Sequence, residues 1–283
     1  MEKKKTPSIR QDGTGQDLID LLVWQEKDFK VSKTSNTTKV EILDELGSVE
    51  LKYFFSIETF SMKYLHYIKK IRDEITGNID KIKGVKAGDQ LLNIKYHAFS
   101  ERLRVKHEGF TLKHYKNVAE ADITKAYYQA ARNLGLISED FYKECLLLPK
   151  LERLRLLGTI ATQKFITVYK KGKRKDMQIK IDKDLRRAWF IICDHVADVM
   201  TEISEMLGTS FLFYWVDGIF FTDTARARQM IRKAGEKFSF EWKFIQVEEM
   251  TAINKEGVVE ILLIKNGEKK VFYPPASAIY KYF

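Results

Sequence analysis

The spacing of hydrophobic and polar positions changes several times along the chain, and each spacing predicts a different kind of element. Apolar residues recur at helical spacing over 59–75 and, most strongly, over 182–207. Alternating positions over 39–56 and 166–181 predict two hairpins. The segment 211–221, FLFYWVDGIFF, predicts two buried strands with a single aspartate between them.

From about residue 115 the predicted elements follow one another closely. A strand over 117–123 leads into a helix over 125–134, which a glycine ends. The other segments with a clear period are helices from 138, over 151–164 and over 224–238, and strands over 240–251, 258–264 and 269–273. This order predicts an α+β fold in which helices cover one face of an antiparallel sheet.

The charge of the chain favours a polyanionic partner. The net charge is +10 and the pI is about 9.3, and basic side chains that neutralise phosphates release condensed counterions. The densest basic run lies at the tip of the 166–181 hairpin, where a solvated turn is an equally weighted alternative to nucleic-acid contact. The residues predicted to contact nucleic acid there are Lys171, Lys173, Arg174 and Lys175.

Composition also restricts the location of the protein. The chain has no run of about 18 apolar residues, so we expect no transmembrane helix and no membrane partner. The N-terminus lacks the apolar stretch of a secretory signal. Cys145 and Cys193 have no close cysteine partner, which favours buried free thiols in a reducing compartment. We therefore expect an intracellular, cytoplasmic protein.

Asp217 is the residue whose position needs the most explanation. Its neighbours on both sides are apolar or aromatic, so an ionised carboxylate there would require a cation or a metal ion. A hairpin turn over 216–218 is an alternative of similar weight, because Asp-Gly is favoured in tight turns.

Asp122 ends the 117–123 strand immediately before a predicted helix. Aspartate is a preferred helix N-cap, so capping is an alternative or an additional role. Two aspartates at strand ends in a basic chain match two-metal phosphoryl transfer. In that chemistry, carboxylates hold two Mg²⁺ or Mn²⁺ ions about 3.5–4 Å apart.

The residues that follow Asp122 carry a family resemblance. The segment 122–128, DITKAYY, resembles the first palm motif of family B DNA polymerases, Asp-x-x-Ser-Leu-Tyr-Pro. The matching positions are Asp122 and Tyr127. The resemblance implies that Asp122 binds both metal ions and that Tyr127 stacks under the incoming sugar and excludes ribose, although Tyr127 could equally be a core aromatic residue.

Two further motifs follow in the order of that family. The segment 214–221, YWVDGIFF, looks like the third motif, Tyr-Gly-Asp-Thr-Asp-Ser-Ile-Phe, with Asp217 at the second, essential aspartate and Trp215 at the first. The basic pair Lys269 and Lys270 resembles, more weakly, the motif that contacts the primer–template duplex. Because Trp215 stands at the first aspartate of the third motif, this chain lacks the secondary carboxylate of that family.

The fingers motif of the family, Lys-x-x-x-Asn-Ser-x-Tyr-Gly, has a counterpart at 150–158. Lys150 and Gly158 match it, whereas Leu154 and Leu157 replace the Asn and the Tyr. This replacement puts ordinary nucleotide selection in doubt. For the triphosphate we expect Lys150, with Arg153 one helical turn along on the same face.

The resemblance covers roughly residues 115–275 and implies a polymerase-like palm with minimal helical fingers, of the sort that a phage or mobile element carries. The expected division is a flexible tail over 1–17, an N-terminal α/β region over 18–114 and a palm-like domain over 115–283. The short helical fingers are expected as an insertion over about 136–164.

Three functions are compatible with these patterns. The first is a template-dependent or terminal nucleotidyltransferase for DNA replication, which uses DNA, or alternatively RNA, with deoxynucleoside triphosphates. The second is a catalytically inactive palm derivative that binds nucleic acid, as a replication accessory or a packaged phage protein. The third is an archaeo-eukaryotic-type primase with Glu120-x-Asp122 as its acidic pair, but the Ser-x-His expected after that pair is missing. Protein partners and oligomeric state stay undetermined by the sequence.

Overall fold

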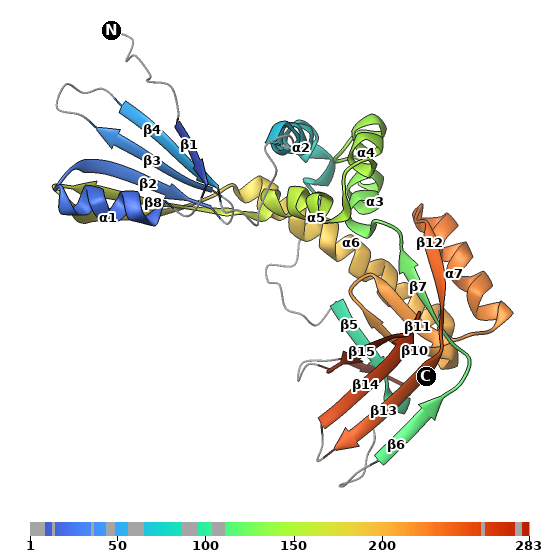
Figure 1. Cartoon of the computed structure of the whole chain (residues 1–283). Coiled ribbons are helices and arrows are strands. Elements are labelled where there is room, and N and C mark those ends of the chain that lie inside the picture. Colours follow the sequence, from blue (N-terminus) through green and yellow to red (C-terminus); the bar gives the residue numbers. More distant parts are fainter. Residues whose placement is uncertain are drawn as a thin grey trace. The chain divides into compact units, whose positions relative to one another are not determined.

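The chain folds into two compact units, each made from two separate stretches of sequence (Figure 1). The computed structural model describes residues 9–12, 15–34, 37–43, 49–55, 65–85, 96–103, 111–255, 258–274 and 279–282. The first unit combines Met1–Asp80 with Glu139–Trp189, and the second combines Lys81–Ser138 with Phe190–Phe283. The units interleave along the chain, whereas the domains expected from the sequence are consecutive.

The first unit contains a six-stranded sheet with the order β1-β4-β3-β2-β8-β9. Its strands are β1 (Ile9–Asp12), β2 (Asp28–Lys33), β3 (Thr37–Leu43), β4 (Val49–Phe55), β8 (Gln163–Lys170) and β9 (Lys173–Ile181). Neighbouring strands are antiparallel except β1 and β4, which are parallel. β1 and the start of α1 fall within 1–17, the stretch expected to be a flexible tail.

Helix α1 (Gln16–Trp24) covers part of one face of this sheet. Ile19 and Leu22 of the helix pack against Phe29, Val31 and other buried strand residues. The amphipathic spacing of α1 therefore supplies one side of a small core, and removing this apolar surface from water stabilises the unit by about 25 cal/mol for each Å².

The helices of the first unit are α2 (Leu65–Gly77), α4 (Glu139–Leu146) and α5 (Lys150–Gly158), followed by a 3₁₀ turn (Thr159–Ala161). Lys70 of α2 forms an ion pair with Glu144 of α4 at 2.7 Å. The sequence predicts a helix that continues to residue 164, but α5 ends at Gly158 and β8 begins at Gln163. The run QKFITVYK alternates and contains β-branched residues, which favours a strand. The start of the 59–75 helix and the turn of the 39–56 hairpin lie partly outside the described residues.

The second unit contains a six-stranded sheet with the order β12-β7-β11-β10-β5-β16. Its strands are β5 (His97–Ser100), β7 (Val118–Ile123), β10 (Phe211–Trp215), β11 (Gly218–Thr222), β12 (Trp242–Val247) and β16 (Ile279–Lys281). Its helices are α3 (Ala126–Asn133), most of α6 (Lys183–Leu207) and α7 (Ala225–Phe238), with short 3₁₀ turns at Glu101–Leu103 and Gly208–Ser210. A further 3₁₀ turn, Ile79–Ile82, spans the boundary between the two stretches at Asp80. The pairs are antiparallel except β16 with β5, so the expected antiparallel sheet is correct for the five strands β12, β7, β11, β10 and β5.

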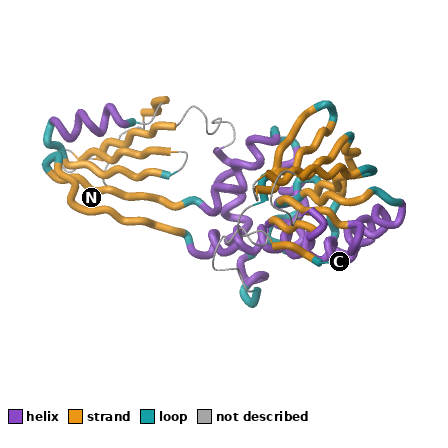
Figure 2. The backbone as a smooth tube through the Cα atoms, turned by 90° about the horizontal axis from the view of Figure 1, so that it is seen from below, coloured by secondary structure: helices purple, strands orange, loops and turns teal. Residues whose placement is uncertain are grey.

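The four strands β7, β10, β11 and β12 form a β-α-β-β-α-β arrangement. Helices lie between β7 and β10 and between β11 and β12 in the sequence, and the spatial order is fourth, first, third, second. The insertion that separates β7 from β10 contains Glu139–Trp189 of the first unit. The strands of each sheet run side by side in both views (Figures 1 and 2).

Helices and a second sheet cover opposite faces of this sheet. On one face, the Tyr214 hydroxyl lies 3.2 Å from the Thr201 hydroxyl of α6. On the other, Phe213 and Phe220 stack with ring centroids 4.2 Å apart, and Phe272 meets both rings edge-on. Phe272 belongs to a four-stranded sheet of β6 (Thr111–Tyr115), β13 (Glu249–Lys255), β14 (Val258–Lys265) and β15 (Glu268–Phe272).

The segment 240–251, expected as one strand, is divided between the two sheets of the second unit. β12 ends at Val247 and pairs with β7, whereas β13 begins at Glu249 and pairs with β14 and β6. A single run of strand-forming residues can serve two sheets, so propensity alone could not reveal this division. Among the described residues, no helix is both long and apolar enough to cross a bilayer.

Candidate active site

Asp122 is held in a central strand of the second unit. β7 pairs with β11 on one side and β12 on the other, and Asp122 lies opposite Gly218 and Lys243. Alternation places Glu120 and Asp122 on the same face of the strand. The Asp122 side chain is half-buried. Two flanking strands therefore fix the backbone that carries this carboxylate.

Asp122 does not act as the N-cap of the following helix. α3 begins at Ala126, and its N-cap position is Lys125, which has a φ of 56°. No side chain makes a capping hydrogen bond there. The capping alternative is therefore wrong, because Asp122 still belongs to the strand, three residues before the helix cap.

Asp217 occupies the tight turn between β10 and β11. Trp215 and Gly218 form the last pair of the hairpin, which leaves Val216 and Asp217 as the turn. Val216 has a φ of 58°, a left-handed conformation that costs a β-branched residue about 1–3 kcal/mol. The Val216 N–H donates to the carbonyl of Tyr96 at 2.8 Å, which holds the turn in place. The turn that we weighed as an alternative for Asp217 is present.

The structure brings Asp122 and Asp217 together at the ends of neighbouring strands. The Ile123 N–H donates to the Asp217 carbonyl at 3.0 Å, and Asp122 lies directly opposite Gly218. Directly opposed residues of an antiparallel pair have Cα atoms about 4.5–5.5 Å apart. Asp217 therefore immediately precedes Gly218, which faces Asp122. Asp122 immediately precedes Ile123, whose N–H bonds to the Asp217 carbonyl.

Gly218 leaves room for two carboxylates. A Cβ atom at this position would lie 3.2 Å from Oε1 of Glu120 and 3.8 Å from Oδ1 of Asp122. The first distance is shorter than ordinary van der Waals contact, so a side chain here would displace the Glu120 carboxylate. The glycine after Asp217 therefore has a steric role in the site.

Glu120 forms an ion pair with Lys265 of β14. Glu120 is only 7% exposed, and the Lys265 side chain is 14% exposed. A carboxylate in such a place needs a partner, because burial of an unpaired charge is costly. Sequence reasoning considered Glu120 only for a primase and missed Lys265, which lies 145 residues away and has no local pattern that could have indicated it.

Tyr127 of α3 is close enough to Asp217 to respond to its charge. Burial is the main cause that raises the pKa of Tyr127, and the negative charge of Asp217 raises it further, together with Cys193 and Tyr96. The phenol is therefore neutral at physiological pH. Sequence reasoning singled out Tyr127 and Asp217 separately, and the second unit brings them into one neighbourhood.

Helix α6 contributes another acidic residue, Asp194, that was not predicted from the sequence. Asp194 is 9% exposed and forms a hydrogen bond with the Tyr96 side chain. Burial raises the pKa of Tyr96, and Cys193 and Asp194 raise it further. Burial also raises the pKa of the Cys193 thiol to about 12, so this cysteine is unreactive near neutral pH. Cys193 and Cys145 are both free and buried, as expected.

The two residues expected to bind the triphosphate belong to the first unit. Lys150 is exposed at the start of α5. The Arg153 guanidinium donates to the carbonyl of Leu146 at 3.3 Å and of Leu148 at 2.6 Å. Arg153 therefore already joins α5 to the end of α4.

The basic residues expected to bind nucleic acid are divided between the units. In the first unit, Lys171 lies in the β8–β9 turn, where its N–H donates to the Asp28 carboxylate at 2.8 Å. The exposed residues Lys173, Arg174 and Lys175 follow on β9. Lys269 and Lys270 are exposed on β15 of the second unit.

The donor set at the strand ends suits a hard divalent cation. Mg²⁺ is commonly held by one or two carboxylates together with the phosphates of a substrate, and Asp122 and Asp217 supply two such groups. Within the described part of the chain, no three acidic, histidine or cysteine side chains are grouped to hold an ion among themselves. Glu120 is paired with Lys265, and Asp122 and Asp217 are the carboxylates that the end of β7 and the β10–β11 turn contribute for Mg²⁺ or Mn²⁺.

No family model matches the chain, and no curated protein matches it. The site is therefore interpreted from its own geometry.

Proposed function

We propose that this chain is a metal-dependent nucleotidyltransferase that acts on nucleic acid, most simply a minimal DNA polymerase-like enzyme. The observation that carries the proposal is the approach of two aspartates from separate strands: Asp122 lies opposite Gly218, and the Asp217 carbonyl accepts from the N–H of Ile123. The β-α-β-β-α-β order around them supports a polymerase-like palm, because it carries one aspartate at a strand end and the other in the adjacent hairpin turn.

The reaction is the attack of a terminal hydroxyl oxygen on the α-phosphorus of a deoxynucleoside triphosphate. A bond forms between that oxygen and the α-phosphorus, and the hydroxyl proton passes to solvent water. The bond between the α-phosphorus and the oxygen that bridges it to the β-phosphorus breaks, which releases pyrophosphate. When bound, two divalent ions would supply activation of the attacking oxygen and charge stabilisation of the leaving pyrophosphate. Asp122 and Asp217 would hold those ions, and β7 and the β10–β11 turn position the two residues before substrate binds.

Two neighbouring residues adjust the charge of the site. Lys265 neutralises Glu120, which limits the negative charge that a triphosphate would meet. The raised pKa of Tyr127 keeps its phenol neutral, so it adds no charge and offers a flat ring beside Asp217 for the incoming sugar.

Primer extension tests this proposal directly. Purified chain is incubated with a labelled primer–template, dNTPs or NTPs, and Mg²⁺ or Mn²⁺. We expect incorporation by the wild type and its loss in Asp217→Ala and Asp122→Asn. Glu236→Gln removes an exposed carboxylate from α7 and serves as the matched control, which retains incorporation. Absence of incorporation by the wild type under every condition overturns the enzymatic proposal.

One observation favours a second candidate, a catalytically inactive palm derivative that binds nucleic acid. Arg153 donates to two backbone carbonyls, so the guanidinium expected to bind triphosphate already has structural partners. For this candidate, the chain binds an oligonucleotide in a mobility-shift experiment and incorporates no nucleotide. Incorporation that depends on Asp217 excludes it.

A further inference from the structure

The β8–β9 hairpin of the first unit leaves one long strand at the edge of its sheet. β9 is the last strand in the order β1-β4-β3-β2-β8-β9, and all nine of its residues are exposed. At about 3.3 Å for each residue, the strand is about 30 Å long. An edge of this length presents unpaired backbone groups as well as side chains to a partner.

One face of the hairpin carries a continuous apolar strip. Phe165 lies opposite Ile179, Thr167 opposite Met177, and Gln163 opposite Ile181, so the four apolar side chains point to the same side. We call them the apolar row: Phe165 (42% exposed), Met177 (49%), Ile179 (52%) and Ile181 (37%). Lone exposed apolar residues are common on proteins, but a contiguous set indicates a contact surface.

Helix α1 covers the neighbouring part of the same face but not the apolar row. Tyr169 and Phe29, which stack 4.3 Å apart, pack with the core under α1. Tyr169 and Phe165 are four residues apart on β8 and therefore share a face. The apolar row thus continues the surface of the α1 core into an exposed region.

The charge of the hairpin is strongly positive. Between Gln163 and Ile181 the only acidic residue is Asp176. The basic residues there are Lys164, Lys170, Lys171, Lys173, Arg174, Lys175 and Lys180. Arg174 pairs with Tyr169, so alternation places it on the face of the apolar row. The directly opposed pairs Lys164–Lys180 and Lys170–Lys173 lie on the other face of the hairpin.

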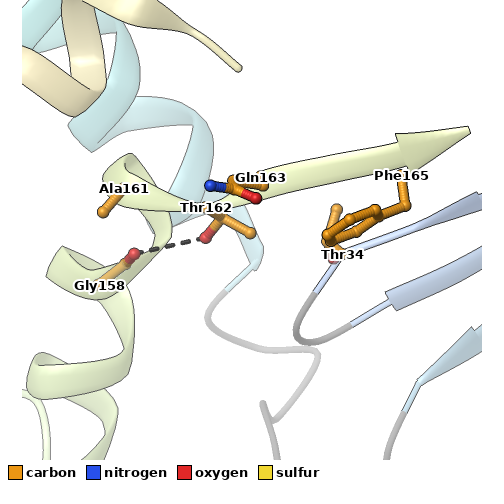
Figure 3. Close-up of a pocket in the computed structure, with 6 residues that line it drawn as sticks. All are labelled: Thr34, Gly158, Ala161, Thr162, Gln163 and Phe165. Atoms are coloured by element: carbon orange, nitrogen blue, oxygen red, sulfur yellow. Dashed lines mark hydrogen bonds between the residues drawn. The ribbon is translucent and has the colours of Figure 1, made fainter. Parts of the chain in front are cut away.

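A hollow of about 400 Å³ lies at one end of the apolar row (Figure 3). It is lined by Thr34, Gly158, Ala161, Thr162, Gln163 and Phe165. The Thr162 hydroxyl donates to the Gly158 carbonyl at 3.4 Å, and the Phe165 ring lies beside Thr34. Its volume falls within the range of about 300–1,000 Å³ of small-ligand sites, and the Gln163 amide can both donate and accept hydrogen bonds.

We propose that the β8–β9 hairpin binds single-stranded nucleic acid, with bases on the apolar row and phosphates at Arg174 and the neighbouring lysines of the tip, Lys171 and Lys175. The inference rests on the proposed function in taking nucleic acid as the partner, and it names the form of that partner and the surface that holds it. Arg174, whose guanidinium meets the Met177 sulfur at 2.8 Å, joins the basic tip to the apolar row. The hollow beside Phe165 accepts one base.

The combination of charge and apolar surface selects this partner over others. A duplex keeps its bases inside, so it would use the lysines and leave the apolar row without a contact. A second copy of the chain would bring two positively charged hairpins together, which repulsion opposes. A single strand uses both features, because its bases stack on apolar and aromatic side chains while its phosphates meet basic ones.

Fluorescence anisotropy with a labelled oligonucleotide of about 15 nucleotides tests the proposal, without metal or nucleotide. The full chain is expected to bind the single strand more tightly than a duplex of the same sequence. Phe165→Ala with Ile179→Ser is expected to weaken single-strand binding at least about tenfold, since stacking of one base is worth roughly 1–3 kcal/mol. Phe165→Tyr keeps the ring and retains binding. Lys171→Gln with Arg174→Gln lowers the slope of log affinity against log salt by about 1.4, or about 0.7 for each phosphate contact.

Matched variants elsewhere in the first unit, in the α4–α5 turn and on α2, control for general surface effects. Leu147→Ser removes a leucine that is 85% exposed, and Lys69→Gln removes one exposed positive charge. Both retain wild-type affinity. Unchanged affinity in the Phe165→Ala, Ile179→Ser variant overturns the proposal, as does tighter binding of duplex than of single strand. If light scattering finds that this variant dissociates a wild-type dimer, the apolar row is a protein contact and the proposal is also wrong. Because no incorporation is measured, this result is independent of the primer-extension experiment.

Discussion

At the scale of single residues, charges at the candidate site are matched within the fold. Glu120 and Lys265 come from different sheets and pair in a poorly exposed place beside Asp122. Removing one member of such a pair leaves the other charge without compensation, whereas removing both does not. The pair can therefore be probed separately from the two aspartates.

We expect Lys265→Met to lower the free energy of unfolding by about 3–5 kcal/mol, because it leaves Glu120 charged and unpaired. The double variant Lys265→Met, Glu120→Gln is expected to recover most of that loss. Urea denaturation followed by circular dichroism measures both. If the single and double variants lose the same stability, the ion pair does not have the role assigned to it.

Two histidines of the second unit make stability depend on pH. Burial lowers the pKa of His97, whose ring lies 4.0 Å from that of Trp215, and burial also lowers the pKa of His195, against an opposing effect of Asp198. The unfolded chain takes up protons at these residues as pH falls through about 6.5, while the folded chain resists protonation until a lower pH. Their contribution to stability is present above that pH and is lost below it.

We accordingly expect the free energy of unfolding to fall as the pH is lowered from about 7 to about 5, with a smaller slope in His97→Gln. Denaturation curves at several pH values measure the slope. An exposed histidine, His66 on α2, provides the control in His66→Gln. A slope that His97→Gln leaves unchanged would show that His97 does not resist protonation.

At the scale of elements, the turn between β10 and β11 fixes Asp217 through an unfavourable conformation. Val216 adopts a positive φ there, and its N–H is bonded to Tyr96. Glycine adopts this conformation without steric cost but is more flexible when unfolded. The conformation of the turn is thus maintained by its surroundings and not by the preference of its own residue.

Val216→Gly is expected to leave stability unchanged or raise it by up to about 1 kcal/mol, because relief of strain offsets the added flexibility. Incorporation in primer extension is expected to fall, since Asp217 is held less firmly. Thermal unfolding and single-nucleotide incorporation rates measure the two effects. A loss of stability above about 1 kcal/mol contradicts the assignment of strain to Val216.

Several elements could be predicted from the sequence because their evidence is local. The period of α6, the alternation of β8 and β9, and the strand that ends with Asp122 all follow from neighbouring residues. The division of 240–251 between two sheets could not be predicted, nor could the pairing of β1 with β4. These features depend on which distant strand lies alongside, and no local pattern records that choice.

The residues of the candidate site also divide into those with a local sequence pattern and those without one. Asp122, Tyr127 and Asp217 could be singled out from short motifs, and the second unit brings them together. Lys265 could not be found in this way, because its partner is remote in sequence. Lys150 and Arg153 were expected beside the aspartates from motif order alone, and they lie in the other unit.

At the scale of the whole molecule, each unit has its own core and is expected to respond to its own substitutions. Gly172, in the β8–β9 turn, has a φ of 66°, and a Cβ there would lie 2.3 Å from the Val23 carbonyl. Gly172→Ala is therefore expected to destabilise the first unit. Lys265→Met is expected to destabilise the second.

Hydrogen exchange measured by mass spectrometry distinguishes these effects. For Gly172→Ala, faster exchange is expected within Met1–Asp80 and Glu139–Trp189, and for Lys265→Met within Lys81–Ser138 and Phe190–Phe283. Equal acceleration over both units in either variant would show that the chain unfolds as one cooperative body.

The interleaving of the units also constrains the order in which the protein can fold during its synthesis. The first unit lacks β8 and β9 until the ribosome has passed Ile181, and β7 lacks both of its neighbours until β11 and β12 have been made. The ion pair of Glu120 cannot form until Lys265 has been translated, 145 residues later. The nascent chain thus carries an incomplete sheet from each unit at the same time, a state in which exposed strand edges favour misassociation. Strand β7 is the element exposed in this way for longest in the second unit's sheet, from its own synthesis until that of β12.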